Sequence, residues 1–239
     1  MNIEVVLSPL HYDARILKHH HATVAVDILR ATSSICAAFA AGVDEIVPLD
    51  SLEPLPSYAG LGYLVAAERG GMKLQGAACG NSPTEYMSMT LTGCKLAYST
   101  TNGTVSILRS ADADHSYVGA FANITALART LLAEENVVVL CSGWEGEPSL
   151  EDTVFAGALV ARLRQMGCVI ELVNDAAMMA CDLWQLAAAD PLAYCSRATH
   201  VHRLERFGDV ARADIRWAFK SDTCSLVPVL RDGRLTVTK

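Results

Sequence analysis

Short apolar segments recur along the chain, and most of them end on polar residues that open an Ala-rich or amphipathic segment. This alternation predicts repeated strand–helix units, which build a mainly parallel sheet with helices on both faces. The predicted strands span residues 1–7, 23–26, 45–49, 63–67, 95–100, 115–119, 136–141 and 168–173. The predicted helices begin near residues 33, 51, 83, 104, 123, 150, 174 and 196. Two last apolar segments, 226–230 and 235–237, flank Asp232-Gly233, which predicts a C-terminal hairpin.

The length and composition indicate one α/β domain over residues 1–239, with a division into two closely packed lobes left open. No apolar run approaches the roughly 20 residues of a membrane span. The first residues carry no positive charge and resemble a strand more than a signal peptide. We therefore expect a cytoplasmic protein without a membrane partner.

The formal net charge of −7 argues against general nucleic-acid binding, which requires a basic face. It does not exclude a small anionic substrate, because local arginines and helix N-termini decide that affinity. The eight cysteines include no CxxC pair, so a structural zinc site is not expected. Lys18 and the three histidines that follow it are predicted to form a solvated loop.

The segment 23–34 places an acid, a base and hydroxyls where a buried strand meets a helix N-terminus. Ligands gather at the carboxyl ends of strands in open α/β sheets, so Asp27 could hold a hard cation there. Arg30 offers a planar set of donors for an anion, and Ser33 and Ser34 would open the helix. The structural alternative is that Asp27 and the serines only cap the helix.

Similar polar groups follow the other predicted strands. The candidates for phosphate or substrate binding are Arg30, Ser33, Ser34, Arg69, Asn81, Ser82, Thr101, Asn102, Gly103, Thr104 and Asn123. The candidate metal ligands are Asp27, Glu68, Glu151 and Asp152. Each group has a local explanation as well: Ser82-Pro83-Thr84-Glu85 is a capping box, and the two acids after Ser149 complement a helix dipole. Their repetition at predicted strand ends favours a shared site.

A parallel sheet would gather Asp27, Glu68, Thr101 and Asp152 along one edge. Carboxylates beside anion-binding turns suggest Mg²⁺ held between the protein and a phosphate group. Two other phosphatase chemistries lack their residues: no cysteine begins a Cys-x5-Arg sequence, and Leu29 replaces the second acid of an Asp-x-Asp pair.

With these segments in order, the sequence resembles the 2-phosphosulfolactate phosphatases, the ComB-like proteins of coenzyme M biosynthesis. The segments that carry the resemblance are 27–34, 68–70, 80–85, 100–104, Asn123, 141–143, 149–152 and the tail around Asp214, Asp222 and Pro228. The resemblance implies a three-layer α/β/α fold and a Mg²⁺-dependent acid phosphatase that converts 2-phospho-3-sulfolactate to 3-sulfolactate and phosphate.

Asp27, Arg30 and Asp152 are the expected catalytic residues, and the nucleophile is either water or Asp27. The expected partner is a small anionic phosphoester, and self-association into a homo-oligomer is left open. Two rival hypotheses remain: a non-catalytic anion-binding or regulatory protein, and a structural subunit whose polar residues only cap helices.

Overall fold

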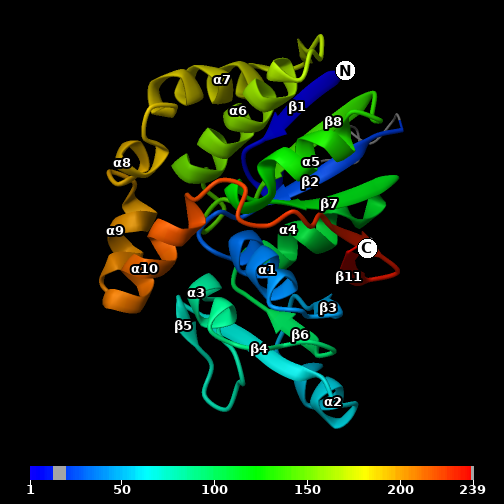
Figure 1. Ribbon diagram of the computed structural model, residues 1–239, viewed down its shortest axis with the longest axis vertical. Coiled ribbons are helices and arrows are strands. Elements are labelled where there is room, and N and C mark those ends of the chain that lie inside the picture. Colours follow the sequence, from blue (N-terminus) through cyan, green and yellow to red (C-terminus); the bar gives the residue numbers. More distant parts are fainter. Residues whose placement is uncertain (13–19, 238–239) are drawn as a thin grey trace.

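The computed structural model describes residues 1–12 and 20–237, and one mixed sheet runs through its whole length (Figure 1). The strands of this sheet are, in spatial order, β5 (Met72–Lys73), β4 (Leu64–Arg69), β6 (Lys95–Ser99), β3 (Glu45–Pro48), β11 (Arg234–Val237), β10 (Pro228–Arg231), β7 (His115–Gly119), β2 (Ala22–Val26), β8 (Asn136–Cys141), β1 (Asn2–Val6) and β9 (Glu171–Leu172).

The sheet consists of two parallel blocks joined by an antiparallel hairpin. Strands β7, β2, β8, β1 and β9 pair in parallel, and so do β3, β6 and β4. The hairpin β10–β11 lies between the blocks and pairs antiparallel with β7 on one side and β3 on the other. Asp232 and Gly233 in its turn have φ angles of 50° and 73°, as a tight primed turn requires. The predicted mainly parallel sheet with a C-terminal hairpin is confirmed.

Helices cover both faces of the sheet. The helices are α1 (Ala31–Ala40), α2 (Leu55–Gly60), α3 (Pro83–Met87), α4 (Gly103–Arg109), α5 (Ile124–Leu131), α6 (Leu150–Gln165), α7 (Asp175–Ala187), α8 (Pro191–Cys195), α9 (Thr199–Glu205) and α10 (Asp209–Ala218). Helices α5, α6 and α7 pack on β7, β8 and β1 and on one another, whereas α4 contacts β2, β3 and the 3-10 turn η1 (Pro9–His11). The result is the predicted α/β/α arrangement.

Strand β8 shows why the central strands are apolar without interruption. Val137 and Val139 belong to the main core, while Val138 and Leu140 join a smaller cluster with Val6 on the opposite face of the sheet. Both faces of β8 are therefore buried, and burial on both faces selects a continuous apolar run instead of an alternating one.

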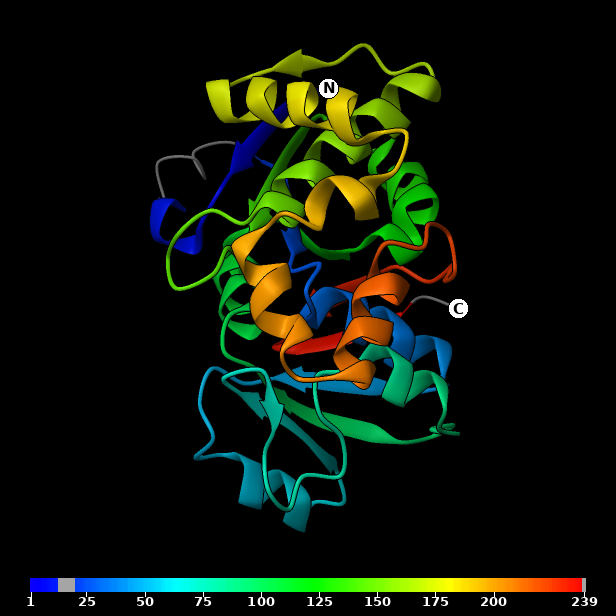
Figure 2. The same cartoon turned by 90° about the vertical axis from the view of Figure 1, so that its left-hand side faces the viewer.

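The C-terminal third differs most from the sequence prediction. The helix predicted to begin near residue 196 begins at Thr199, as α9, and neither α8 nor α10 was predicted. Figure 2 shows α8 to α10, in gold and orange, between the upper helices and the lower strands. Lys18 and His19 lie outside the described residues, but His21 is buried, so the prediction of a solvated loop is wrong for His21. Among the described helices, none has the length and apolar character needed to span a membrane.

Candidate active site

Both blocks of the sheet contribute polar residues to one small cavity. Asp27 follows β2 in the first block, whereas Glu68 ends β4 and Thr101 follows β6 in the second. The cavity is small, with a volume of about 30 Å³. Its lining residues include Asp27, Arg30, Glu68, Asn81, Thr101, Asn102, Trp144, His200 and Arg203.

This gathering has a different origin from the one predicted. Three successive antiparallel pairings, from β7 to β10, β11 and β3, reverse the second block relative to the first within the sheet. Asp27 and Glu68 therefore do not follow one another along the carboxyl edge of a single parallel sheet. They approach from two blocks that flank the same cavity.

Asp27 and Glu68 are the two carboxylates that line the small cavity, and both are buried, at 7% and 5% exposure. Burial raises the pKa of Asp27 to about 6, although His200 and the Ala31 backbone N–H act in the opposite direction. Gly103 lies directly against it, since a Cβ atom there would stand 2.6 Å from Asp27 Oδ2. An acid with this pKa can exchange a proton near neutral pH or be held ionised by a cation.

Glu68 shares its carboxylate between the protein and the cavity. Its Oε1 accepts hydrogen bonds from the Gly71 backbone N–H and from the Thr101 hydroxyl. Its Oε2 has no hydrogen-bond partner among the described residues. Glu68 can therefore offer an oxygen to a bound group without breaking either of its hydrogen bonds.

Glu151 and Asp152, both fully buried, do not line this cavity, and Glu151 lines a separate one beside Trp144 and His200. Ser149 caps α6 by accepting from the Asp152 N–H, as predicted. The Asp152 carboxylate accepts from Ile28 N at 2.8 Å and from Gly143 N at 3.2 Å, so it ties together the loops after β2 and β8. Burial, Asp27 and Glu151 raise its pKa well above the ordinary value. Its two oxygens are thus engaged by backbone donors and not by a helix dipole alone.

Arg30 is held by a buried ion pair that the sequence analysis did not predict. Its Nη1 lies 3.0 Å from Asp214 Oδ2, and its Nη2 donates to the Gly71 carbonyl at 2.7 Å. Asp214, in α10, has no exposed surface and also accepts from Ser82 Oγ at 2.7 Å and from Thr84. The pair therefore joins α10 to the start of α3 and fixes the guanidinium of Arg30 at the cavity wall.

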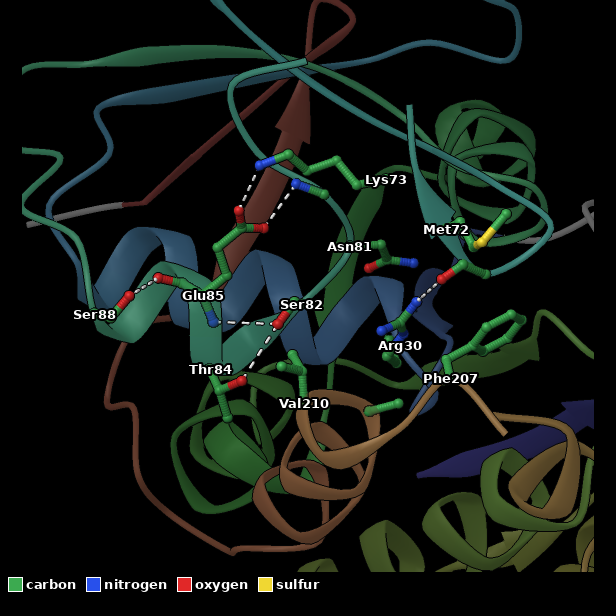
Figure 3. A pocket seen from close by; sticks show the side chains of 13 residues that line it. Arg30, Met72, Lys73, Asn81, Ser82, Thr84, Glu85, Ser88, Phe207 and Val210 are labelled. Carbon is green, nitrogen blue, oxygen red and sulfur yellow. Dashed lines mark hydrogen bonds and ion pairs between the residues drawn. The ribbon is translucent and has the colours of Figure 1, made fainter. Parts of the chain in front are cut away.

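A larger cavity of about 600 Å³ adjoins the small one and shares Arg30, Gly71 and Asn81 with it. Figure 3 shows Arg30, Met72 and Phe207 at one end of this cavity and the ion pair of Lys73 with Glu85 at the other. The hydroxyl of Tyr98 donates to Asn81 Oδ1, which leaves the amide nitrogen on the side of Arg30. The two cavities together offer a polar end and a roomier, partly apolar end.

Several residues predicted to bind phosphate are engaged elsewhere. Ser33 Oγ donates to the Ile28 carbonyl, and Thr104 exchanges hydrogen bonds with Thr100. The guanidinium of Arg69 donates to the Glu68 carbonyl and to Ser99. The Asn123 side chain accepts from Ala120 N and donates to the Val118 and Leu226 carbonyls. Ser34 is fully buried in α1. None of these five residues lines either cavity described above.

Trp144, His200 and Arg203 also line the small cavity and were not among the predicted site residues. His200 stacks on Trp144 with ring centroids 5.7 Å apart, and its Nδ1 lies 3.1 Å from Glu151 Oε1, without the alignment of a hydrogen bond. The Arg203 guanidinium lies 5.2 Å from the centroid of the Trp144 ring. The basic pattern of residues 196–207 was the available signal, but nothing local relates that segment to β2.

The small cavity offers two carboxylates, Asp27 and Glu68, as side-chain ligands for Mg²⁺. In the described part of the chain, no three Asp, Glu, His or Cys side chains lie close enough together to form a metal-binding group. Mg²⁺ commonly uses only one or two carboxylates and takes its other ligands from water and phosphate oxygens. Asp27 and Glu68 fit that requirement, whereas the oxygens of Asp152 are already used by backbone N–H groups.

Buried carboxylates, a fixed arginine and a small polar cavity at strand ends define an α/β protein that is equipped to act on a small anion. The chain belongs to the 2-phosphosulpholactate phosphatase family, whose model matches residues 10–233. Family membership makes it a phosphatase, a phosphoric monoester hydrolase, as the sequence predicted.

Three curated relatives are similar in sequence to this chain over most of their length. A protein of Parasynechococcus marenigrum called probable 2-phosphosulfolactate phosphatase is 39% identical over 87% of this chain and 88% of its own. A relative of the same description from Symbiobacterium thermophilum is 32% identical over 90% of this chain and 93% of its own. A third, from Thermosynechococcus vestitus, is 35% identical over 86% and 87%.

Proposed function

We propose that the protein hydrolyses 2-phospho-3-sulfolactate, or a closely similar small phosphoester with further anionic groups, and that it requires Mg²⁺. The family and its curated relatives support the substrate. The observation that supports the requirement for Mg²⁺ is that two buried carboxylates, Asp27 and Glu68, line the same small cavity.

Asp27 and Glu68 are the residues that would hold Mg²⁺ in this proposal. When bound, the ion would withdraw charge from the phosphoryl oxygens and so stabilise the transition state of phosphoryl transfer. Glu68 keeps its place through its bonds to Gly71 and Thr101, and Asp27 is enclosed by Gly103. Neither carboxylate has to change its backbone surroundings to accept a cation.

Arg30 supplies fixed hydrogen-bond donors at the wall shared by the two cavities. Asp214 and the Gly71 carbonyl hold two of its nitrogens, so its orientation is set before substrate arrives. Preorganised donors of this kind stabilise developing charge without reorganisation during the reaction. The amide of Asn81, oriented by Tyr98, offers a second donor from the opposite block.

The test is a phosphatase assay on a panel of small phosphoesters, in the presence of Mg²⁺ and after thorough chelation. We expect the highest kcat/KM for substrates that carry a carboxylate or sulfonate near the phosphoester, and loss of turnover without the metal. Undiminished turnover after chelation would refute the role of Mg²⁺. Binding of phosphoesters without any hydrolysis would favour the alternative of a non-catalytic anion-binding protein.

A further inference from the structure

Among the residues that the structure describes, Arg203 is the one arginine at the small cavity whose charge has no protein partner. Within residues 1–12 and 20–237, no carboxylate pairs with it and no hydrogen bond involves its guanidinium. Arg30, by contrast, is neutralised by Asp214 at 3.0 Å. An unpaired arginine beside the carboxylates Asp27 and Glu68 keeps its donors available for a ligand.

Aromatic rings hold Arg203 in position without occupying its donors. The guanidinium lies 5.2 Å from the ring centroid of Trp144 and 5.8 Å from that of Phe207. Contact with a ring face uses the flat surface of a guanidinium and leaves the N–H groups at its edge free. Stacking also allows small displacements of the guanidinium when a ligand enters the cavity.

The position of Arg203 corresponds to the junction of the two cavities. Trp144 lines the small cavity, and Phe207 lines the larger one. A phosphoryl group bound beside Asp27 and Glu68 would leave the rest of its substrate at this junction. The group next to the ester oxygen would then be the first to meet the arginine.

We infer that Arg203 binds a second anionic group of the substrate, a carboxylate or sulfonate carried beside the phosphoester. This role rests on the proposed function, because it assumes that the phosphoryl group occupies the small cavity. The guanidinium edge forms two parallel hydrogen bonds with a carboxylate or sulfonate, a geometry that a lysine does not reproduce. Arg203 is therefore a specificity-determining residue, and α9 carries it.

Arg197 provides a matched control on the same segment of the chain. It is also stacked on an aromatic ring, 4.2 Å from the centroid of Tyr194, but it is exposed and lines neither cavity. R203A, R203K and R197A would be compared with the wild type on two substrates of similar size. These are 2-phospholactate, which has a carboxylate beside the ester, and isopropyl phosphate, which has a methyl group in its place.

We expect R203A to lower kcat/KM for 2-phospholactate by about 10- to 100-fold, mainly through KM, as loss of a charge-assisted hydrogen bond implies. For isopropyl phosphate, R203A should change kcat/KM by less than about threefold. For 2-phospholactate, R203K should restore only part of the loss, and R197A should match the wild type. Equal losses on both substrates, or a loss no greater than that of R197A, would overturn the inference.

The dissociation constant of 3-sulfolactate, measured by calorimetry, provides a readout that does not depend on turnover. R203A should weaken this binding by a similar factor, while its thermal unfolding midpoint stays near that of R197A. Unchanged binding in R203A refutes the role of Arg203 even if the enzyme is active. Failure of the wild type to hydrolyse any phosphoester would refute the proposed function instead, and binding would still decide the role of Arg203.

Discussion

Replacing Asp27 with Asn should separate the stability of the fold from the chemistry of the site. Asp27 is 7% exposed, and its burial raises its pKa to about 6 from an ordinary value of 3.8. Between these two pH values the folded protein retains a proton that the unfolded chain has released. The resulting contribution to stability is fully present below about pH 4 and is lost as the pH rises through 6.

The size of this effect follows from the two pKa values. A difference of about two pH units corresponds to about 3 kcal/mol of unfolding free energy for one group. At pH 8 the metal-free wild type should therefore carry a cost that an uncharged amide avoids. We expect D27N to be more stable than the wild type by up to about 3 kcal/mol at pH 8, and nearly equal to it at pH 4. Its kcat/KM should nevertheless fall at least about 100-fold.

Urea unfolding at pH 4, 6 and 8, in the presence of a chelator, measures the first part of this prediction, and the phosphatase assay measures the second. D44N serves as the control, because Asp44 is exposed and outside both cavities. The same pH dependence of unfolding in D27N and the wild type, or a lower stability of D27N at pH 8, would refute the prediction. Full activity in D27N would remove Asp27 from the catalytic machinery.

Three further substitutions test other parts of the site. R30K should lower kcat/KM far more than R162K, because a lysine cannot keep both contacts of Arg30, with Asp214 and with the Gly71 carbonyl. Similarly mild losses of kcat/KM in the two variants would show that Arg30 is structural. G103A should lower the urea midpoint, with a loss of about 1–3 kcal/mol, since its Cβ would lie 2.6 Å from Asp27 Oδ2; an unchanged midpoint contradicts that close contact. D152N should have a free energy of unfolding about 1–3 kcal/mol lower than that of D27N at pH 8. The reason is that the backbone N–H of either Ile28 or Gly143 loses its acceptor.

Helix starts could be predicted from the sequence because their hydrogen bonds are local. Ser82 accepts from Glu85 N and Ser149 from Asp152 N, each three residues away, as capping patterns predict. The capping box of α3 is only half formed, since the Glu85 carboxylate accepts from Gly80 N. Asn123 also departs from the pattern, because its amide reaches the Leu226 carbonyl, about 100 residues away.

The insertion of the hairpin between two parallel blocks could not be read from the sequence. Its turn has a local signature in Asp232-Gly233, but its neighbours β7 and β3 are set by long-range pairing. The strand pairing of β11 with β3 has one residue pair in register, Leu235 with Ile46. No pattern of apolar residues specifies so short a pairing, although it determines how the two blocks face each other.

The segment that closes the site escaped prediction for a similar reason. Helices α8 to α10 are short, and the bond that fixes the segment joins Arg30 to Asp214 across 184 residues. The acids at the strand ends could be predicted from the sequence because each follows an apolar run. The pairing of Asp214 with Arg30 and the roles of Trp144, His200 and Arg203 could not, because they depend on packing between distant parts of the chain.

The charges around the small cavity support the expectation of a divalent cation. Two carboxylates, Asp27 and Glu68, line it, and the positive charge of Arg30 is balanced by Asp214. Arg203 then remains as the arginine with free charge in the described lining. A phosphoester with a second anionic group would bring more negative charge than one guanidinium can offset. A cation held by Asp27 and Glu68 reverses that balance, so metal and substrate should bind with positive cooperativity, each lowering the electrostatic cost of the other.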